Sequence, residues 1–558
     1  MPPRRSAPVA DSKKWYWGAC AAAAVVVLFL FFGPNFGTAD VSGSLSTTSS
    51  LRYSTEKSLR VATWNIAAIN NNPFEYWITH KDKAYNKLMA DVQAFIDTPG
   101  NNDVPVKDVF TENMFAELKT RLIAGGTSKD FADKVEKRWN SDFKSRKIVS
   151  GFLKDPVIGS KRLASMPDRV TNTIGLASGD MAYRPTVINC YKGHLGSIVS
   201  WWEQWKEFMF ETKYTFKTGE EPKTVSSILV KIKKSKYPAI TTEEETISIP
   251  LQTLAAAIFD AVLVHMMNIV GGDTWQGLRT EMCNALNLKK MDRTQEILES
   301  AYTDADVILL QEVSQNFIKD ARTSVLNDRY YVLAPEKLNR RDQNSIVMLR
   351  KALFDITDLE DATKKVYGRF DKTVPVAEGD VYAFFITDAE NRKYFFASFH
   401  GDTNGLATIP VLQAVYDVWK EATKGGKQVR FIFGLDANTY EHAVKGKTQD
   451  VMEFAAFFHS LGMNSCWGRP INPANHTTYN ARTYLQTQLN KASSKSDILK
   501  KGDVNPKDFI LFFDDTFKST GTTKDNTGKH KFIENMVFPT LSFPSDHGIL
   551  SSTLTLIK

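Results

Sequence analysis

The sequence is short of cysteine, and this excludes two classes of protein. Four cysteines in 558 residues are too few for a disulfide scaffold. They form no CxxC pair and no Cys/His cluster with the spacing of a zinc site. Cys20 lies in an apolar run, which leaves Cys190, Cys283 and Cys466, and three thiols allow at most one bridge. The chain also lacks internal repeats, so a repeat architecture is excluded as well.

Neither positive nor negative charge dominates the sequence. The net charge is +7, with 24% charged and 42% hydrophobic residues, which is ordinary for a globular protein. This balance tolerates an anionic substrate but does not require one. The length allows two or more domains.

One long apolar run without charge stands near the N-terminus. Trp15–Phe32 follows four Lys and Arg residues, and no Lys or Arg follows it until Arg52. By the positive-inside rule this predicts a single-pass signal anchor, with residues 1–14 as a short cytosolic tail and the body lumenal or extracellular. The alternatives are a cleaved signal peptide, which makes the protein secreted, and an organelle-targeting leader. Residues 33–58, rich in Ser and Thr, are predicted to be a flexible linker.

Polar residues end several strand-like runs in the rest of the chain. These runs are Leu59–Asn65, Asp306–Glu312, Tyr394–His400 and Val429–Asn438, and Ser545–His547 precedes a last apolar run. The ends of buried strands lie at one edge of a sheet, where ligands bind in layered α/β proteins. An Asn, a Glu, a His, an Asp-x-Asn pair and an Asp-His pair at one edge predict a metal-assisted phosphoryl site.

The acidic and amide residues at these ends suit magnesium. Glu312 and the amide oxygen of Asn65 are hard oxygen ligands of the kind that Mg²⁺ binds, with Mn²⁺ as an alternative. Asp436 and Asn438 are two residues apart on an extended segment and project to one side. Asp436 is therefore a candidate for activating a water, and Asn438 for donating to a phosphoryl oxygen. The alternatives are that Glu312 pairs with a basic residue, Asn65 caps a turn, and Asp436 and Asn438 form an Asx turn.

Two histidines complete the candidate set. His400 ends one strand and His547 follows Asp546. A carboxylate partner raises the basicity of an imidazole, and Asp508, at the start of another strand, is the candidate partner of His547. The pair is suited to acid–base catalysis or to holding a phosphate.

A stretch of about 220 residues separates the first of these strands from the second. Apolar residues at helical spacing predict helices over Lys81–Asp97, Thr111–Ile123, Ile198–Phe210 and Leu251–Ile269. We interpret residues 74–290 as a mainly helical insertion into, or lid upon, a sheet-based core.

The sequence supports more specific predictions for one tryptophan cluster and three polar segments. Trp201, Trp202 and Trp205 are expected in a hydrophobic core, because they share one helix, rather than on a base-stacking or membrane surface. Met166–Ile174 and Arg184–Gly193 are interpreted as loops, with substrate contact as the alternative. Asn472–Lys507 is interpreted as a surface loop.

The order of the motifs resembles the endonuclease/exonuclease/phosphatase superfamily. The matching motifs are ATWNI (62–66), LLQEVS (309–314), SFHGDTNG (398–405), GLDANT (434–439), KDFILF (507–512) and PSDH (544–547). The family more often has an apolar residue where this chain has Gly401 after the histidine. Some members have an acidic ligand where this chain has Ala67, so a two-metal scheme is doubtful. The resemblance covers residues 59–66 and 291–558 and leaves the insertion and the N-terminus unexplained. We assign residues 59–73 and 291–558 to the catalytic domain.

This resemblance implies a fold and a set of roles. The implied fold is an α/β four-layer αββα sandwich. Asn65 and Glu312 would bind Mg²⁺, and Asp546 would support the metal or the water. Asp436 would align the attacking water, Asn438 and His400 would contact phosphate oxygens, and His547, oriented by Asp508, would stabilise the pentavalent phosphorus.

The expected activity is metal-dependent hydrolysis of a phosphoester. A nuclease-type phosphodiester is the preferred substrate, so the expected partner is a nucleic acid. The alternatives are a sphingomyelinase-like or other lipid phosphodiesterase and an inositol-phosphate phosphatase, whose partners are phospholipid or inositol phosphate, with the membrane contacted through residues 15–32. A membrane-tethered binding protein without catalytic activity is the alternative from another class.

Overall fold

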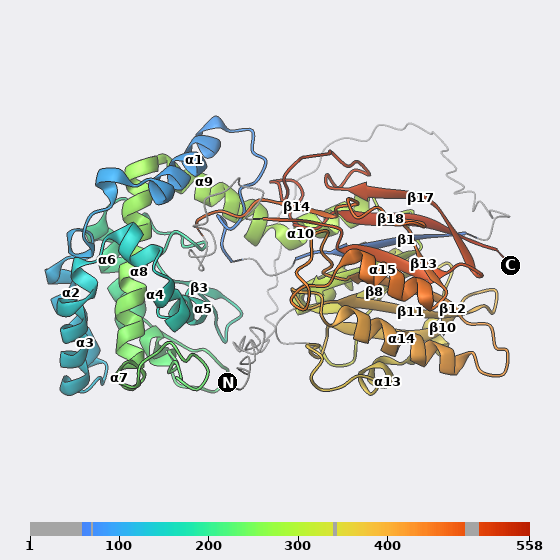
Figure 1. Ribbon diagram of the computed structural model, residues 1–558, viewed down its shortest axis with the longest axis horizontal. Helices are drawn as coiled ribbons and strands as arrows, with labels where there is room; N and C mark the ends of the chain where they lie inside the picture. The colour runs from blue at the N-terminus through green and yellow to red at the C-terminus, as the bar shows by residue number, and fades with distance from the viewer. Residues whose placement is uncertain (1–57, 68–70, 339–342, 486–501, 558) are drawn as a thin grey trace, which may run out of the picture.

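The computed structural model describes residues 58–67, 71–338, 343–485 and 502–557. The predicted membrane anchor and residues 33–57 of the predicted linker lie outside these residues, and Ser58, assigned to the linker, is the first residue of β1. Figure 1 shows a helical part on one side and two β-sheets on the other, with α10 and the β14 strand between them. The prediction of an α/β protein with two sheets and many helices is confirmed.

The first sheet has six strands and is mixed. Its order is β17 (Phe517–Asp525), β18 (Ile549–Leu556), β1 (Ser58–Asn65), β6 (Val307–Val313), β8 (Asn344–Arg350) and β7 (Tyr330–Leu333). The β1 and β6 strands are parallel, so Asn65 lies beside Gln311 at their carboxyl ends. The other neighbouring pairs are antiparallel.

The second sheet also has six strands. Its order is β13 (Met463–Ser465), β16 (Asp508–Phe513), β12 (Arg430–Asp436), β11 (Lys393–His400), β10 (Val381–Thr387) and β9 (Glu360–Asp361). The β11 and β12 strands are parallel and bring His400 opposite Asp436, while β16 is antiparallel to β12 and begins with Asp508 opposite Asp436. Both sheets therefore present their polar strand ends at an edge.

The sheets pack face to face through an apolar core. Val61, Leu309, Phe396, Ile432 and Ile510 belong to this core and are buried. Gly434 allows the sheets to approach closely, since a Cβ at this position would lie 2.8 Å from Leu309 Cβ and 3.0 Å from Thr63 Oγ1.

Helices cover the outer face of each sheet. Residues of α10 (Lys290–Ser300), α11 (Gln315–Ala321) and α12 (Leu326–Arg329) pack on the first sheet. Residues of α13 (Thr363–Tyr367), α14 (Thr408–Ala422) and α15 (Val451–Ser460) pack on the second. The central strands are apolar on both faces. Each sheet is therefore covered by the other sheet on one face and by helices on the other.

The helical part has a core of its own. It contains α1 (Lys83–Asp97), α2 (Glu112–Ala124), α3 (Lys129–Ser141), α4 (Pro156–Lys161), α5 (Ser165–Thr171), α6 (Ile198–Lys206), α7 (Thr242–Thr246), α8 (Ser248–Gly271) and α9 (Thr274–Cys283). The short β2–β3 (Thr173–Gly175, Met181–Tyr183) and β4–β5 (Lys213–Tyr214, Lys223–Thr224) pairs also lie here. Trp201, Trp202 and Trp205 are buried in this core, as expected. The cysteines form one disulfide, Cys190–Cys283, within the limit set by the sequence.

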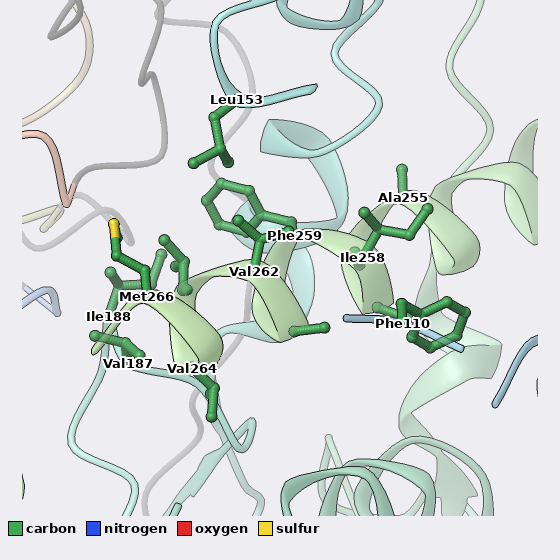
Figure 2. Close-up of a cluster of buried hydrophobic side chains, with 14 of the residues drawn as sticks. Phe110, Leu153, Val187, Ile188, Ala255, Ile258, Phe259, Val262, Val264 and Met266 are labelled. Carbon is green, nitrogen blue, oxygen red and sulfur yellow. The ribbon is translucent and has the colours of Figure 1, made fainter. Parts of the chain in front are cut away.

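The α8 helix is the centre of the helical part. Figure 2 shows Phe110, Leu153, Val187 and Ile188 around the α8 side chains. Among the described residues, α8 is the one helix long and apolar enough to cross a membrane, but 72% of its apolar window is buried inside the protein. Its composition is therefore accounted for by core packing.

The interpretation of Asn472–Lys507 as a surface loop is wrong for its described residues. They include β14 (Thr478–Asn480) and β15 (Asp503–Asn505), which pair as a hairpin. Tyr484 and Leu485 are 3% and 0% exposed, and both belong to the core of the helical part. Polar composition concealed this packing, because the apolar residues of the segment are few.

The interpretation of Met166–Ile174 as a loop is wrong, because the α5 helix covers Ser165–Thr171 and the β2 strand begins at Thr173. Arg184–Gly193 contains no helix or strand, as expected, but part of it lies in the core. Arg184 is fully buried, with its guanidinium Nη2 2.6 Å from Asp168 Oδ1 and its Nε 2.7 Å from Asp260 Oδ2. A charged residue that finds such partners can lie in a core.

Candidate active site

The carboxyl ends of the two parallel strand pairs bring four of the expected residues together. His400 Nε2 lies 3.0 Å from Glu312 Oε1 and 3.6 Å from Asp436 Oδ2. Asn65 Nδ2 donates to Asp436 Oδ2 at 2.9 Å and to Glu312 Oε1 at 3.3 Å. Residues from both sheets therefore meet in one cluster.

The backbone is strained at this edge. Glu312 and Asn438 have φ values of +54° and +49°, in the left-handed region that non-glycine residues seldom adopt. The pairing of β6 with β8 shifts register between Leu310 and Val313, which is where Glu312 leaves the regular ladder. Strain of this kind persists where surrounding structure fixes it, and it clusters at functional sites.

A second group joins the cluster from β16 and the segment before β18. His547 Nδ1 lies 2.9 Å from Asp508 Oδ2, as the sequence predicted for this pair, and His547 Nε2 lies 3.7 Å from Asp436 Oδ2. Asp508 is fully buried, and its Oδ1 atom has no hydrogen-bond partner among the described residues. Asp436 Oδ2 is thus close to Asn65, His400 and His547 at once.

Burial and neighbouring charges shift the pKa values of this cluster. Burial by itself would raise the pKa of Glu312, but His400, His547 and Asn65 lower it to about 2. Burial would lower the pKa of His547, but the charges of Asp508 and Asp436 raise it to about 10. At neutral pH Glu312 is therefore ionised and His547 is an imidazolium.

Asp436 and Asn438 form the turn that follows β12. The backbone N–H of Asn438 donates to Asp436 Oδ1 at 2.9 Å, and Asn438 Nδ2 donates to Asp436 Oδ2 at 3.2 Å. The Asx turn considered as an ordinary alternative is therefore present, and it places both side chains in the cluster. Asn438 Nδ2 also donates to Gly401 O at 3.3 Å, and Lys507 Nζ donates to Asn438 Oδ1 at 2.9 Å.

Asp546 lies toward the helical part. Its Oδ2 accepts a hydrogen bond of 2.8 Å from Tyr76 Oη. Lys290, the first residue of α10, donates to Ala67 O. Burial lowers the pKa of its ammonium, and the nearby charges of Asp546 and Glu312 offset this only in part. Arg482 stacks over the Tyr76 ring at 5.1 Å and pairs with Glu75.

Four residues of this site were missed by the sequence analysis: Tyr76, Lys290, Arg482 and Lys507. Tyr76 and Lys290 lie at the two ends of the long stretch 74–290, and Arg482 lies in the segment interpreted as a surface loop. Their partners are more than 200 residues away in the chain, so no local pattern signals them. Lys507 immediately precedes Asp508, and this was the one sequence feature that could have indicated its place in the site.

The donor set fits a hard divalent cation. Glu312, Asp436, Asp508 and Asp546 bring four carboxylates to one edge, and one of their oxygens, Asp508 Oδ1, has no hydrogen-bond partner among the described residues. Oxygen ligands with a surplus of negative charge are those that Mg²⁺ and Mn²⁺ select. The Asn65 side-chain amide would have to rotate to serve as a ligand. Its Oδ1 accepts from the backbone N–H of Ala67 at 2.9 Å, and its Nδ2, rather than its oxygen, faces the carboxylates. Ligand atoms of Asp436, Asp508 and His547 also lie within 4.8 Å of one another.

Part of the helical region is similar to a known protein family. Residues 103–280, in the helical part, match a family described as Domain of unknown function (DUF8234). No curated protein matches the sequence.

Several solved structures resemble about half of the chain. Truncated TDP2 of Caenorhabditis elegans has a TM-score of 0.31 and 14% identity over 49% of this chain and 93% of that chain. The human Nocturnin catalytic domain with bound sulfate gives 0.33 and 14% over 50% and 89%. ANGEL2, a 2',3'-cyclic phosphatase, gives 0.33 and 12% over 48% and 86%. TM-scores and identities this low do not establish a shared activity.

Proposed function

We propose that this protein is a divalent-metal-dependent phosphoester hydrolase of the endonuclease/exonuclease/phosphatase superfamily. Residues 59–73 and 291–558 form its catalytic domain, an αββα sandwich, and residues 74–290 form a helical insertion. The observation that carries the proposal is the convergence on Asp436 Oδ2 of Asn65 at 2.9 Å, His400 at 3.6 Å and His547 at 3.7 Å.

A cation held by Glu312, Asn65 and Asp546 would neutralise charge on the phosphoryl oxygens. Asp436 is held among hydrogen-bond donors and is placed to orient a water for attack on phosphorus. His547, kept protonated by Asp508, and the Asn438 amide offer donors where negative charge develops on phosphoryl oxygens. His400 holds Glu312 and offers a further donor. The ion pairing fixes these groups before substrate binds, which lowers the reorganisation needed during reaction.

A phosphodiester of nuclease type is the preferred substrate. Sphingomyelin-like lipids and inositol phosphates are the alternatives. A panel of DNA, RNA, sphingomyelin and inositol phosphates, incubated with Mg²⁺ and residues 50–558, ranks these classes by kcat/KM. Hydrolysis of none of them, with or without Mn²⁺, would favour the silent binding protein.

The catalytic role is tested with Asp436→Asn, which keeps the shape of the side chain and removes its charge. Loss of the group that orients water is expected to lower kcat by about 10²–10⁴-fold. Asp417→Asn on α14 is the matched control, because Asp417 bonds to Gln413 on its own helix. Equal activity of Asp436→Asn and the wild type, with bis(p-nitrophenyl) phosphate as substrate, contradicts the proposal.

The cellular placement is a part of the same proposal. The Cys190–Cys283 disulfide supports a body in an oxidising compartment, lumenal or extracellular, because disulfides seldom persist in the cytosol. A single-pass anchor at residues 15–32 would hold it there. Alkaline carbonate extraction of membranes separates this outcome from secretion, since an integral anchor stays with the pellet.

A further inference from the structure

Lys507 is a buried lysine directly behind the candidate phosphate-binding amide. The residue is 3% exposed and lies between β15 and β16. Its Nζ donates to Asn438 Oδ1 at 2.9 Å, pairs with Asp503, and lies 5.2 Å from the centre of the Tyr440 ring. Burial would lower the pKa of Lys507, but the charge of Asp503 raises it, so the side chain is a cation at every working pH.

The chemistry of an ammonium decides how the Asn438 amide is turned. A lysine ammonium has three donors and no acceptor, so it can bond only to the oxygen of an amide. With Oδ1 held by Lys507, Asn438 Nδ2 must point the other way, toward Asp436 Oδ2 and Gly401 O. A flipped amide would present Oδ1 to the Asp436 carboxylate and to any phosphate oxygen, and both contacts would be repulsive.

Asn438 needs such a constraint for a second reason. Its backbone has φ +49°, and the two hydrogen bonds from Nδ2 to Asp436 and Gly401 are long, at 3.2 and 3.3 Å. The contact with Lys507 is the shortest hydrogen bond that its side chain makes. The lysine is in turn held by Asp503, opposite Asn480 in the β14–β15 hairpin.

We propose that Lys507 is a positioning residue that fixes the Asn438 amide with its NH₂ group facing the substrate phosphate. The inference rests on the proposed phosphoester hydrolysis. Asp503 holds the lysine, the lysine orients the amide, and the amide donates to a phosphoryl oxygen as charge develops there. The effect therefore appears mainly in kcat, since the interaction strengthens in the transition state.

A double-mutant cycle tests this chain of contacts. All proteins carry Asp503→Asn, so that removing the lysine leaves no unpaired buried carboxylate. Lys507→Met, Asn438→Ala and the combination are compared with the Asp503→Asn parent, using bis(p-nitrophenyl) phosphate and Mg²⁺. Thermal unfolding of each protein checks that the fold is kept.

The expected result is non-additive. Lys507→Met lowers kcat by about 10–100-fold with KM changed by less than about threefold, and it has no further effect once Asn438 is alanine. A purely structural lysine would instead lower the melting temperature and leave kcat per folded molecule unchanged. Retention of kcat within about twofold, or losses that multiply in the combined variant, overturns the inference.

A binding measurement keeps the inference separate from the proposed function. If the wild-type protein hydrolyses nothing, the proposed function fails, and titration calorimetry with inorganic phosphate then decides about Lys507. Equal weakening of phosphate binding by Lys507→Met, Asn438→Ala and the combination supports the positioning role. Unchanged binding in Lys507→Met, or weakening that multiplies, contradicts it.

Discussion

Two clusters of buried charge lie in the two parts of the molecule, and they differ in how completely their carboxylate oxygens are hydrogen-bonded. In the helical part Arg184 lies between Asp168 and Asp260, and Asp260 also accepts from Thr186 and Trp205. This cluster is closed, because each carboxylate has donors fixed by the fold. It explains why a charged residue can lie in that core, and it requires no ligand.

The cluster at the edge of the sheets is not closed in this way. Asp508 Oδ1 is buried and has no partner among the described residues, and Glu312 lies in left-handed backbone. An arrangement that folding alone would select against is evidence of a role in binding or catalysis. Both clusters are buried, so burial does not distinguish them. The structural cluster differs from the functional one in that each of its carboxylates has hydrogen-bond donors fixed by the fold.

The largest expected effect is on stability in the helical cluster. Arg184→Met leaves two buried carboxylates without their cation, so the free energy of unfolding is expected to fall by about 3–5 kcal/mol, measured by urea unfolding. Activity per folded molecule should be unchanged. Adding Asp168→Asn and Asp260→Asn should restore part of the loss. A folded Arg184→Met protein without activity would contradict the division into structural and functional clusters.

A cation should act on the other cluster alone. A bound divalent ion stabilises the folded state, by about 2.7 kcal/mol at a concentration of 100 Kd, and raises the melting temperature measured by calorimetry. Glu312→Gln should abolish this rise. Glu281→Gln, a glutamate of the helical part that pairs with His80, is the matched control and should keep it. Equal rises in both variants would place the cation elsewhere.

The residues at the ends of strands could be predicted from the sequence for a local reason. A run such as Tyr394–His400 is buried and regular, and a polar residue at its end is costly unless it has a partner or a ligand. Asn65, Glu312, His400, Asp436, Asn438, Asp508 and His547 were found in this way, and the structure brings them together. Asp546 was also expected here, and it reaches the cluster beside Lys290 and Tyr76.

The residues that complete the site could not be predicted in this way. Tyr76 meets Asp546 across 470 residues of sequence, and Lys290 meets Ala67 across 223. Such contacts depend on how the helical part sits on the sheets, which no local pattern encodes. Arg184 lies in a loop, as expected, but its burial could not be predicted, since its carboxylate partner Asp260 is 76 residues away.

The smallest expected effect is a pH dependence that belongs to the sheet cluster and not to the helical one. His547 has a folded pKa of about 10, above the ordinary value near 6.5. Protonation therefore stabilises the fold fully below pH 6.5, and this contribution is lost as the pH rises from 6.5 through 10. The difference in unfolding free energy between the wild type and His547→Gln, in the presence of a chelator, should shrink by about 1–3 kcal/mol between pH 6 and pH 10. The protein with Arg184→Met, Asp168→Asn and Asp260→Asn together has no titrating group left in the helical cluster, and Arg184 does not titrate in this window, so its deficit relative to the wild type should change little. A constant difference for His547→Gln would show that the imidazole is not held as a cation by Asp508 and Asp436.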